Sequence, residues 1–161
     1  MSLVIDTLRT STITEELSDA EVQILGSLFE VKSYKAGEQI TKPGDEGHDN
    51  LFILANGDIE VKIHNGSEIS TIHVLKPGDL AGIITFVGGA ASHISATLFA
   101  MGDTQVLSLE RARFETLINS HPMIMYRVMR GVVRNVHGIV RRMNMQAVEM
   151  SNYIFSSKGR Y

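Results

Sequence analysis

The chain has 161 residues and a mass of 17.7 kDa, and because chains divide into domains only as they approach ~250 residues, we expect one domain. It has no cysteine and no run of about eighteen apolar residues, which argues against disulfide frameworks, cysteine-ligated zinc sites and membrane-spanning helices. Its net charge is −3 and its pI is near 6.0, unlike the strongly basic balance of a nucleic-acid-binding domain. No basic start precedes an apolar segment, and we expect a cytoplasmic protein.

The first element predicted along the chain is a helix near residues 18–29. Ser18 and Glu21 have the spacing of a capping box, in which each side chain accepts a hydrogen bond from the other residue's backbone N–H. Apolar residues follow at spacings of three and four, beginning with Val22 and Leu25. This combination of a cap and a helical period predicts an N-terminal helix.

Residues 31–110 show short apolar runs separated by turns centred on glycine, a residue that adopts positive φ with little steric cost. The predicted strands are 31–34, 39–41, 51–55, 59–63, 69–75, 95–100 and 104–109. Hairpin dipeptides such as Asn56-Gly57 lie between them. Strands at this spacing indicate a sandwich or an antiparallel β jelly roll.

A helical pattern returns after Glu110, and Pro122 suits the first turn of a further helix. From residue 122 to 150, residues recur at alternating spacings of four and three, the seven-residue repeat of a coiled-coil seam. The predicted seam is Met125, Met129, Val132, Val136, Ile139 and Met143. We therefore predict a β-roll with flanking helices over 1–121, a long helix over 122–150 that makes a homodimer, and a polar tail over 151–161.

The charge of the chain is divided unevenly at Pro122. The residues before it include eight Lys or Arg and seventeen Asp or Glu, a balance of −9, and the remainder has a balance of +6. Much of this positive charge forms a stripe on the predicted long helix: Arg127, Arg130, Arg134, His137 and Arg141. The stripe lacks interleaved aromatic residues, so we interpret it as a solvated flank attracted to the acidic body and expect no direct nucleic-acid binding.

Several short motifs, in this order of elements, resemble one known family. They are Ala36-Gly37-Glu38-Gln39-Ile40, Pro43-Gly44-Asp45, the hairpin 51–61 with Gly57 at its tip, Leu75-Lys76-Pro77-Gly78-Asp79, Ala96-Thr97 and Leu107-Ser108-Leu109-Glu110-Arg111. The ordered set is similar to the cyclic-nucleotide-binding domain family, which includes the regulatory domains of cyclic-AMP-dependent kinase and of Crp/Fnr-type regulators. The resemblance covers roughly residues 15–145. It implies a mainly β fold with flanking α, an antiparallel β jelly roll (double-stranded β-helix) between an N-terminal helix and a long C-terminal helix.

The resemblance also implies a ligand pocket, and here the chain departs from the family pattern. In the family a glutamate after a glycine takes the ribose hydroxyl, and an arginine takes the cyclic phosphate. The chain has Gly82-Ile83 at the first position and Ile94 in place of the arginine. Hydrogen bonds to charged groups contribute ~1.5–3 kcal/mol each. Losing the contacts of both the glutamate and the arginine therefore weakens the binding of a cyclic nucleotide by roughly two to four orders of magnitude. The candidate pocket residues are Gly82, Ile83, Ile84, Ser92, His93, Ile94, Ser95, Ala96 and Thr97.

Other chemistries find less support in the sequence. A replacement polar cluster could form beside an anion nest at 82–89, from Ser92, His93, Ser95 and Thr97. Turn residues of this kind more often form a solvated loop. A metal site of the cupin type needs clustered histidines, whereas His48 has no His-x-His partner. No catalytic spacing is present, so we expect no enzyme activity, catalytic residue, metal or cofactor.

The sequence thus predicts a non-enzymatic regulatory and signal-relay module that has lost cyclic-nucleotide binding and acts on an unknown protein partner. A change at the pocket would shift the chain near 110–122 and so the long helix. The alternatives are a cyclic-nucleotide sensor with altered contacts and a cupin-type metalloenzyme. Crp/Fnr-type regulators continue into a helix-turn-helix, for which we expect too few residues after 150.

Overall fold

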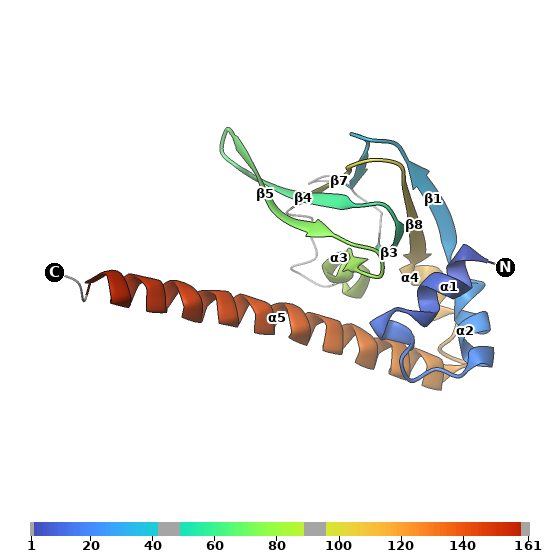
Figure 1. The fold of residues 1–161 in the computed structure, drawn as a ribbon. Helices are drawn as coiled ribbons and strands as arrows, with labels where there is room; N and C mark the ends of the chain where they lie inside the picture. The colour runs from blue at the N-terminus through green and yellow to red at the C-terminus, as the bar shows by residue number, and fades with distance from the viewer. Residues whose placement is uncertain (1, 42–48, 89–95, 159–161) are drawn as a thin grey trace.

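The computed structural model describes residues 2–41, 49–88 and 96–158, and it places helices at both ends of a β-rich middle (Figure 1). The N-terminal elements are α1 (Leu3–Arg9), the 3-10 helix η1 (Thr12–Thr14) and α2 (Asp19–Gly26). The predicted N-terminal helix is confirmed as α2, and its capping box is complete: Ser18 Oγ accepts from the Glu21 N–H at 3.2 Å, and Glu21 Oε1 accepts from the Ser18 N–H at 3.0 Å. The helical elements before it were not predicted, although Ser2 and Ser11 cap them in the same way.

The middle of the chain forms two four-stranded antiparallel sheets. One sheet has the order β1 (Glu30–Tyr34), β8 (Thr104–Glu110), β3 (Asn50–Asn56) and β6 (Leu80–Ala81). The other has the order β2 (Gln39–Thr41), β7 (Thr97–Ala100), β4 (Ile59–Asn65) and β5 (Glu68–Leu75). All seven predicted strands are present, whereas β6 was missed because it has only two residues. The fold class is confirmed, and the two sheets do not close into a continuous barrel over the residues that the structure describes.

The sheet that contains β3 is the central layer of the molecule. Because side chains alternate across a strand, Leu51 and Ile53 face the helices while Phe52 and Leu54 face the other sheet. The result is two buried clusters. The larger one joins the central sheet to the helices, and the smaller one fills the space between the sheets with residues such as Leu98 of β7.

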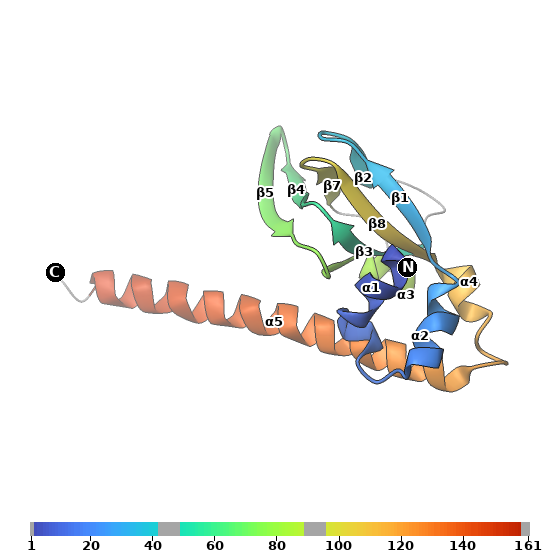
Figure 2. The ribbon, with the colours of Figure 1, turned by 45° about the vertical axis from the view of Figure 1, so that its right-hand side comes forward.

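After β8 the chain forms α4 (Arg111–Glu115) and then α5 (Pro122–Lys158). The first turns of α5 pack on the N-terminal helical elements, and the rest projects from the body as a single rod in both views (Figures 1 and 2). The predicted long helix is confirmed, but the prediction of a tail from 151 is wrong as far as Lys158, because no glycine or proline interrupts the helix between Gly138 and Gly159. None of the described helices is both long and apolar enough to cross a membrane.

Helix α5 contacts η1 at Gly131, where the two backbones approach closely. A Cβ on Gly131 would lie 2.5 Å from Ile13 Cα and 2.6 Å from the carbonyl oxygen of Thr12. Both neighbours are backbone atoms, so a side-chain rotation cannot relieve the steric overlap. By contrast, a Cβ on Gly138 of the same helix would meet no atom within 4 Å.

We expect opposite effects from the same substitution at these two glycines. Gly131→Ala should destabilise the protein by about 1–3 kcal/mol, because the added methyl group separates α5 from η1. Gly138→Ala should stabilise it by up to about 1 kcal/mol, because alanine favours an exposed helix. Urea unfolding followed by circular dichroism measures both changes. Equal effects of the two substitutions would contradict the close contact at Gly131.

Candidate functional site

The segment predicted to hold the pocket begins at Gly82, which precedes the short helix α3 (Ile83–Val87). Gly82 has a φ of +77°, and a Cβ on it would lie 2.5 Å from the carbonyl oxygen of Asn50 on β3. Glycine satisfies both constraints, because it adopts positive φ freely and has no Cβ to meet that oxygen. This close approach fixes where α3 begins against the central sheet.

The side chains of α3 face different surroundings. Ile83 is half-buried and packs against the larger core cluster. Phe86 is buried, with its ring centroid 5.4 Å from that of Phe114. Ile84 is 63% exposed. The isoleucine that stands where the family has its ribose-binding glutamate therefore supports the core and offers no hydrogen bond.

The other predicted pocket residues lie on β7 or before it. Thr97, the first residue of β7, is buried, and Ala96 is half-buried. Residues 92–95 lie outside the described residues, as does His48, on which the metal alternative depended. Over the described ranges there is no group of three or more His, Asp or Glu side chains that could hold a metal ion.

A cavity of about 470 Å³ lies between the β4–β5 hairpin and α5. On the sheet side it is lined by Val61, Ile72, His73, Leu75, Asp79 and Leu80, and on the helix side by Asn135, Ile139, Arg142, Met143 and Gln146. Figure 2 shows the hairpin beside the part of α5 that has left the body. The volume is that of a small-molecule site. Gly82, Ile83 and Ile84 are not among its lining residues.

This cavity was not predicted from the sequence, because Ile139 and Met143 were assigned to a dimer seam and the sheet residues to strands. A signal was nevertheless present. Asn135, Arg142 and Gln146 recur at spacings of seven and four, so these polar side chains share one face of the helix. Ile139 lies on that same face, between Asn135 and Arg142.

The structure divides the predicted dimer seam into two parts. Met125 and Met129 are half-buried and pack against the larger core cluster, and Val132 belongs to that cluster with 3% exposure. Val136 and Ile139 are 38% and 36% exposed, and Met143 beyond them is 61% exposed. The first three residues thus bind α5 to the chain's own body, and the last three extend past it.

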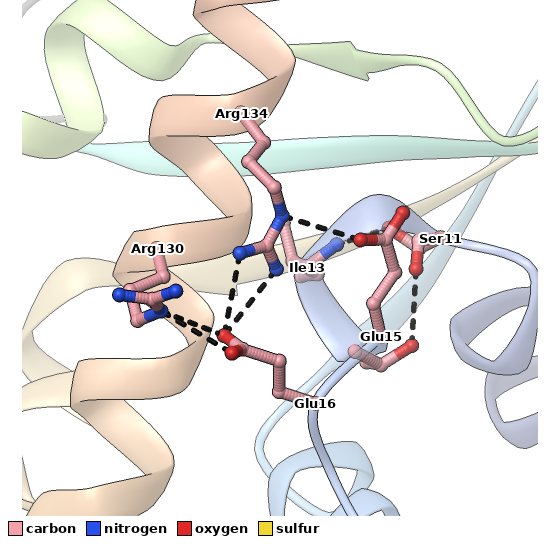
Figure 3. Close-up of polar contacts among 7 residues, drawn as sticks. Ser11, Ile13, Glu15, Glu16, Arg130 and Arg134 are labelled. Atoms are coloured by element: carbon pink, nitrogen blue, oxygen red, sulfur yellow. Dashed lines mark hydrogen bonds and ion pairs between the residues drawn. The ribbon is translucent and has the colours of Figure 1, made fainter.

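Three arginines of α5 form ion pairs with three glutamates near η1 and α2, and we call this set the Arg–Glu network. Figure 3 shows the part of it that Arg130 and Arg134 form with Glu15 and Glu16. Arg130 Nε donates to Glu16 Oε2 at 3.0 Å, and Arg134 Nη1 donates to the same oxygen at 3.3 Å. Arg134 Nε also lies 3.2 Å from Glu15 Oε2. Arg127 completes the network through a 3.0 Å contact with Glu21. The first part of the basic stripe is therefore neutralised by the acidic body.

The network lowers the pKa of two of its carboxyl groups, those of Glu16 and Glu21. Hydrogen bonds from Arg130, supported by Arg134, lower the pKa of Glu16 below its ordinary value. The pKa of Glu21 is lowered first by the hydrogen bond from the Ser18 backbone and further by Arg127. A carboxyl group whose pKa is lower in the folded state stabilises folding above its unfolded-state pKa, and it loses that contribution as the pH falls through the folded-state pKa.

We expect Glu16→Gln to weaken the attachment of α5 at neutral pH. The amide carries no charge, so it leaves Arg130 and Arg134 without their shared anion. At pH 7 the free energy of unfolding of the variant should be lower than that of the parent. The difference should become smaller towards pH ~3, because Glu16 is then protonated in the parent. It should also become smaller in about 1 M salt, because salt screens the ion pairs. Urea unfolding at the two pH values measures it. Glu68→Gln on the exposed β5 is the control, and an effect of equal size there would contradict the role of Glu16.

Comparisons with known proteins agree with the arrangement of sheets and helices. Residues 31–121 match the cyclic nucleotide-binding domain family, and since this segment is more than half of the chain, the chain belongs to that family. The cyclic AMP receptor protein of Thermus thermophilus is 30% identical over 115 residues, which cover 71% of this chain and 52% of that protein. The cGMP-dependent protein kinase of Eimeria tenella is 28% identical over 107 residues, which cover 66% of this chain and 10% of the kinase.

A solved structure of a cyclic nucleotide-binding domain from Methylobacillus flagellatus has the same fold. It superposes with a TM-score of 0.80 at 19% identity, and the match covers 92% of this chain and 82% of that one. The chain spans about half the length of the first relative and a tenth of the second. The resemblance inferred from the motifs is therefore confirmed at the level of family and fold.

Proposed function

We propose that the chain is a non-enzymatic regulatory module that has lost cyclic-nucleotide binding and relays the occupancy of the cavity beside α5 to the position of that helix. The observation that carries the proposal is Ile83. It occupies the place of the family's ribose-binding glutamate, and its side chain packs into the helical core. A second apolar residue, Ile94, stands where the family has the arginine that takes the cyclic phosphate.

The described surroundings of α3 offer no unpaired cation as a substitute. Arg111 approaches Gly88 at the end of α3, but its Nη2 lies 2.7 Å from Asp49 Oδ2 and its Nε lies 3.8 Å from Glu115 Oε1. A guanidinium that already has two carboxylate partners gains little from a third anion, because the new contact replaces an existing one. This pairing supports loss of the cyclic phosphate contact.

The second candidate function is a cyclic-nucleotide sensor with altered contacts. The names of two relatives favour it, since one is a cyclic AMP receptor protein and the other a cGMP-dependent kinase. The cavity beside α5 would also be large enough for part of such a ligand. Binding measurements separate the two candidates.

We expect neither cyclic AMP nor cyclic GMP to bind at micromolar concentrations. Loss of both charged contacts should weaken binding by roughly two to four orders of magnitude relative to a family member that retains them. Isothermal titration calorimetry with up to millimolar nucleotide should show no saturable heat. A micromolar Kd for either nucleotide would identify the chain as a sensor and contradict the proposal.

The relay needs a helix that is anchored at one end and responsive at the other. The Arg–Glu network and Gly131 hold the first part of α5, whereas Ile139 and Met143 line the cavity and continue the apolar stripe. A ligand that displaces these two side chains would alter the stripe. We place a homodimer contact there, because Val136, Ile139 and Met143 keep the seven-residue repeat while remaining accessible. The protein partner remains to be identified, and the proposal places the module in the cytoplasm without nucleic-acid contact.

We expect Val136→Glu to convert dimers into monomers. A two-fold contact repeats each residue, so one substitution introduces two buried charges. Met145→Glu is the matched control, because Met145 is 57% exposed and lies half a turn around α5 from Val136. Sedimentation velocity should show monomers for the first variant and dimers for the second. A dimer that survives Val136→Glu would contradict the predicted seam.

A further inference from the structure

We propose that the cavity between the β4–β5 hairpin and α5 binds a small carboxylic acid with an apolar body, an inference that rests on the proposed function and names the class of its ligand. The carboxylate would meet Arg142, and the apolar body would lie between the sheet and the helix.

The apolar part of the lining comes from both walls. On the sheet side, Leu75 and Leu80 are buried at the base of the cavity, and Val61 beside them is half-buried. On the helix side, Ile139 and Met143 face the same space. A ligand body that fills this space gains roughly 25 cal/mol for each Å² of apolar surface removed from water. These two walls select an apolar body.

The charge of the lining selects an anion. Arg142 lines the cavity from α5, and among the described residues it has no ion-pair partner, unlike Arg127, Arg130 and Arg134 of the same helix. His73 of β5 faces the same cavity and adds a second nitrogen group that can donate a hydrogen bond. A guanidinium in a partly apolar site is a strong partner for a carboxylate.

The acidic residue of the lining has a structural role already. Asp79 Oδ2 accepts a hydrogen bond from the Lys76 N–H at 2.9 Å, which closes the turn between β5 and β6. Its carboxylate therefore lies at the turn, where it restrains the sheet wall. Asn135 and Gln146 are uncharged and can accept or donate hydrogen bonds to a polar substituent. Of the lining residues, Arg142 is thus the cation that is left without an ion pair in the part of the chain that the structure describes.

The experiment compares naphthalene carboxylate with naphthalene carboxamide, which have the same shape and differ in charge. Calorimetry on the whole chain should give saturable binding of the carboxylate and at least about tenfold weaker binding of the carboxamide, because a charge-assisted contact is lost. Arg142→Gln should remove the preference for the carboxylate. Arg141→Gln is the matched control, since Arg141 is the adjacent arginine and is not among the lining residues, and it should leave the preference unchanged.

Three results would overturn the inference: equal affinity for the two compounds, equal effects of the two arginine substitutions, or no binding of either compound. Cyclic AMP is titrated into the same preparation as a separate arm. Saturable micromolar binding of cyclic AMP would contradict the proposed function itself. Absence of naphthalene carboxylate binding without cyclic AMP binding would remove only the assigned ligand class.

Discussion

The contact of α5 with η1 is the constraint on which the rest of the arrangement depends. At Gly131 the helix lies against the backbone of Thr12 and Ile13, too close for any side chain. The Arg–Glu network continues this contact along the helix and adds attraction between opposite charges. Together they set the direction in which α5 leaves the body, and that direction places its middle turns opposite the β4–β5 hairpin. Without this attachment the cavity would lose one of its walls.

The central sheet connects this attachment to the pocket region. One face of β3 carries Leu51 and Ile53 into the helical cluster, and the other face carries Phe52 and Leu54 into the space between the sheets. Helix α3 begins on β3 through the close approach of Gly82 to Asn50. The proposed relay would pass through this layer, which has packed side chains on both faces, because close-packed interiors compress little.

The chemistry of the site follows from how charge is distributed over these layers. The resemblance puts isoleucines at the family's two charged contacts, and Ile83 packs against the larger core cluster. Arg111 of α4, which approaches Gly88 after α3, is paired with Asp49, and the arginines in the first half of α5 are paired with glutamates. Arg142 is different because α5 has passed the acidic N-terminal elements by this point. The cavity therefore combines apolar walls with an arginine that has no ion-pair partner among the described residues, and our proposal of an apolar acid as its ligand is based on this combination.

The sequence by itself determined the strands, the capped helix α2 and the long helix, because glycine turns, capping residues and hydrophobic period are local properties of the chain. The order of short motifs along the chain also identified the family, which needs no coordinates. The replacement of the family's two charged contacts by isoleucine remains a prediction from the sequence. Only the tertiary structure decided how the seven-residue repeat of α5 is used. Val132 and Ile139 are seven residues apart and so have the same place in that pattern, but Val132 is buried in the chain's own core and Ile139 is 36% exposed. A sequence repeat shows which residues share a face of the helix. Which segment packs against that face depends on contacts between distant parts of the chain, as the pairing of Arg130 with Glu16 does.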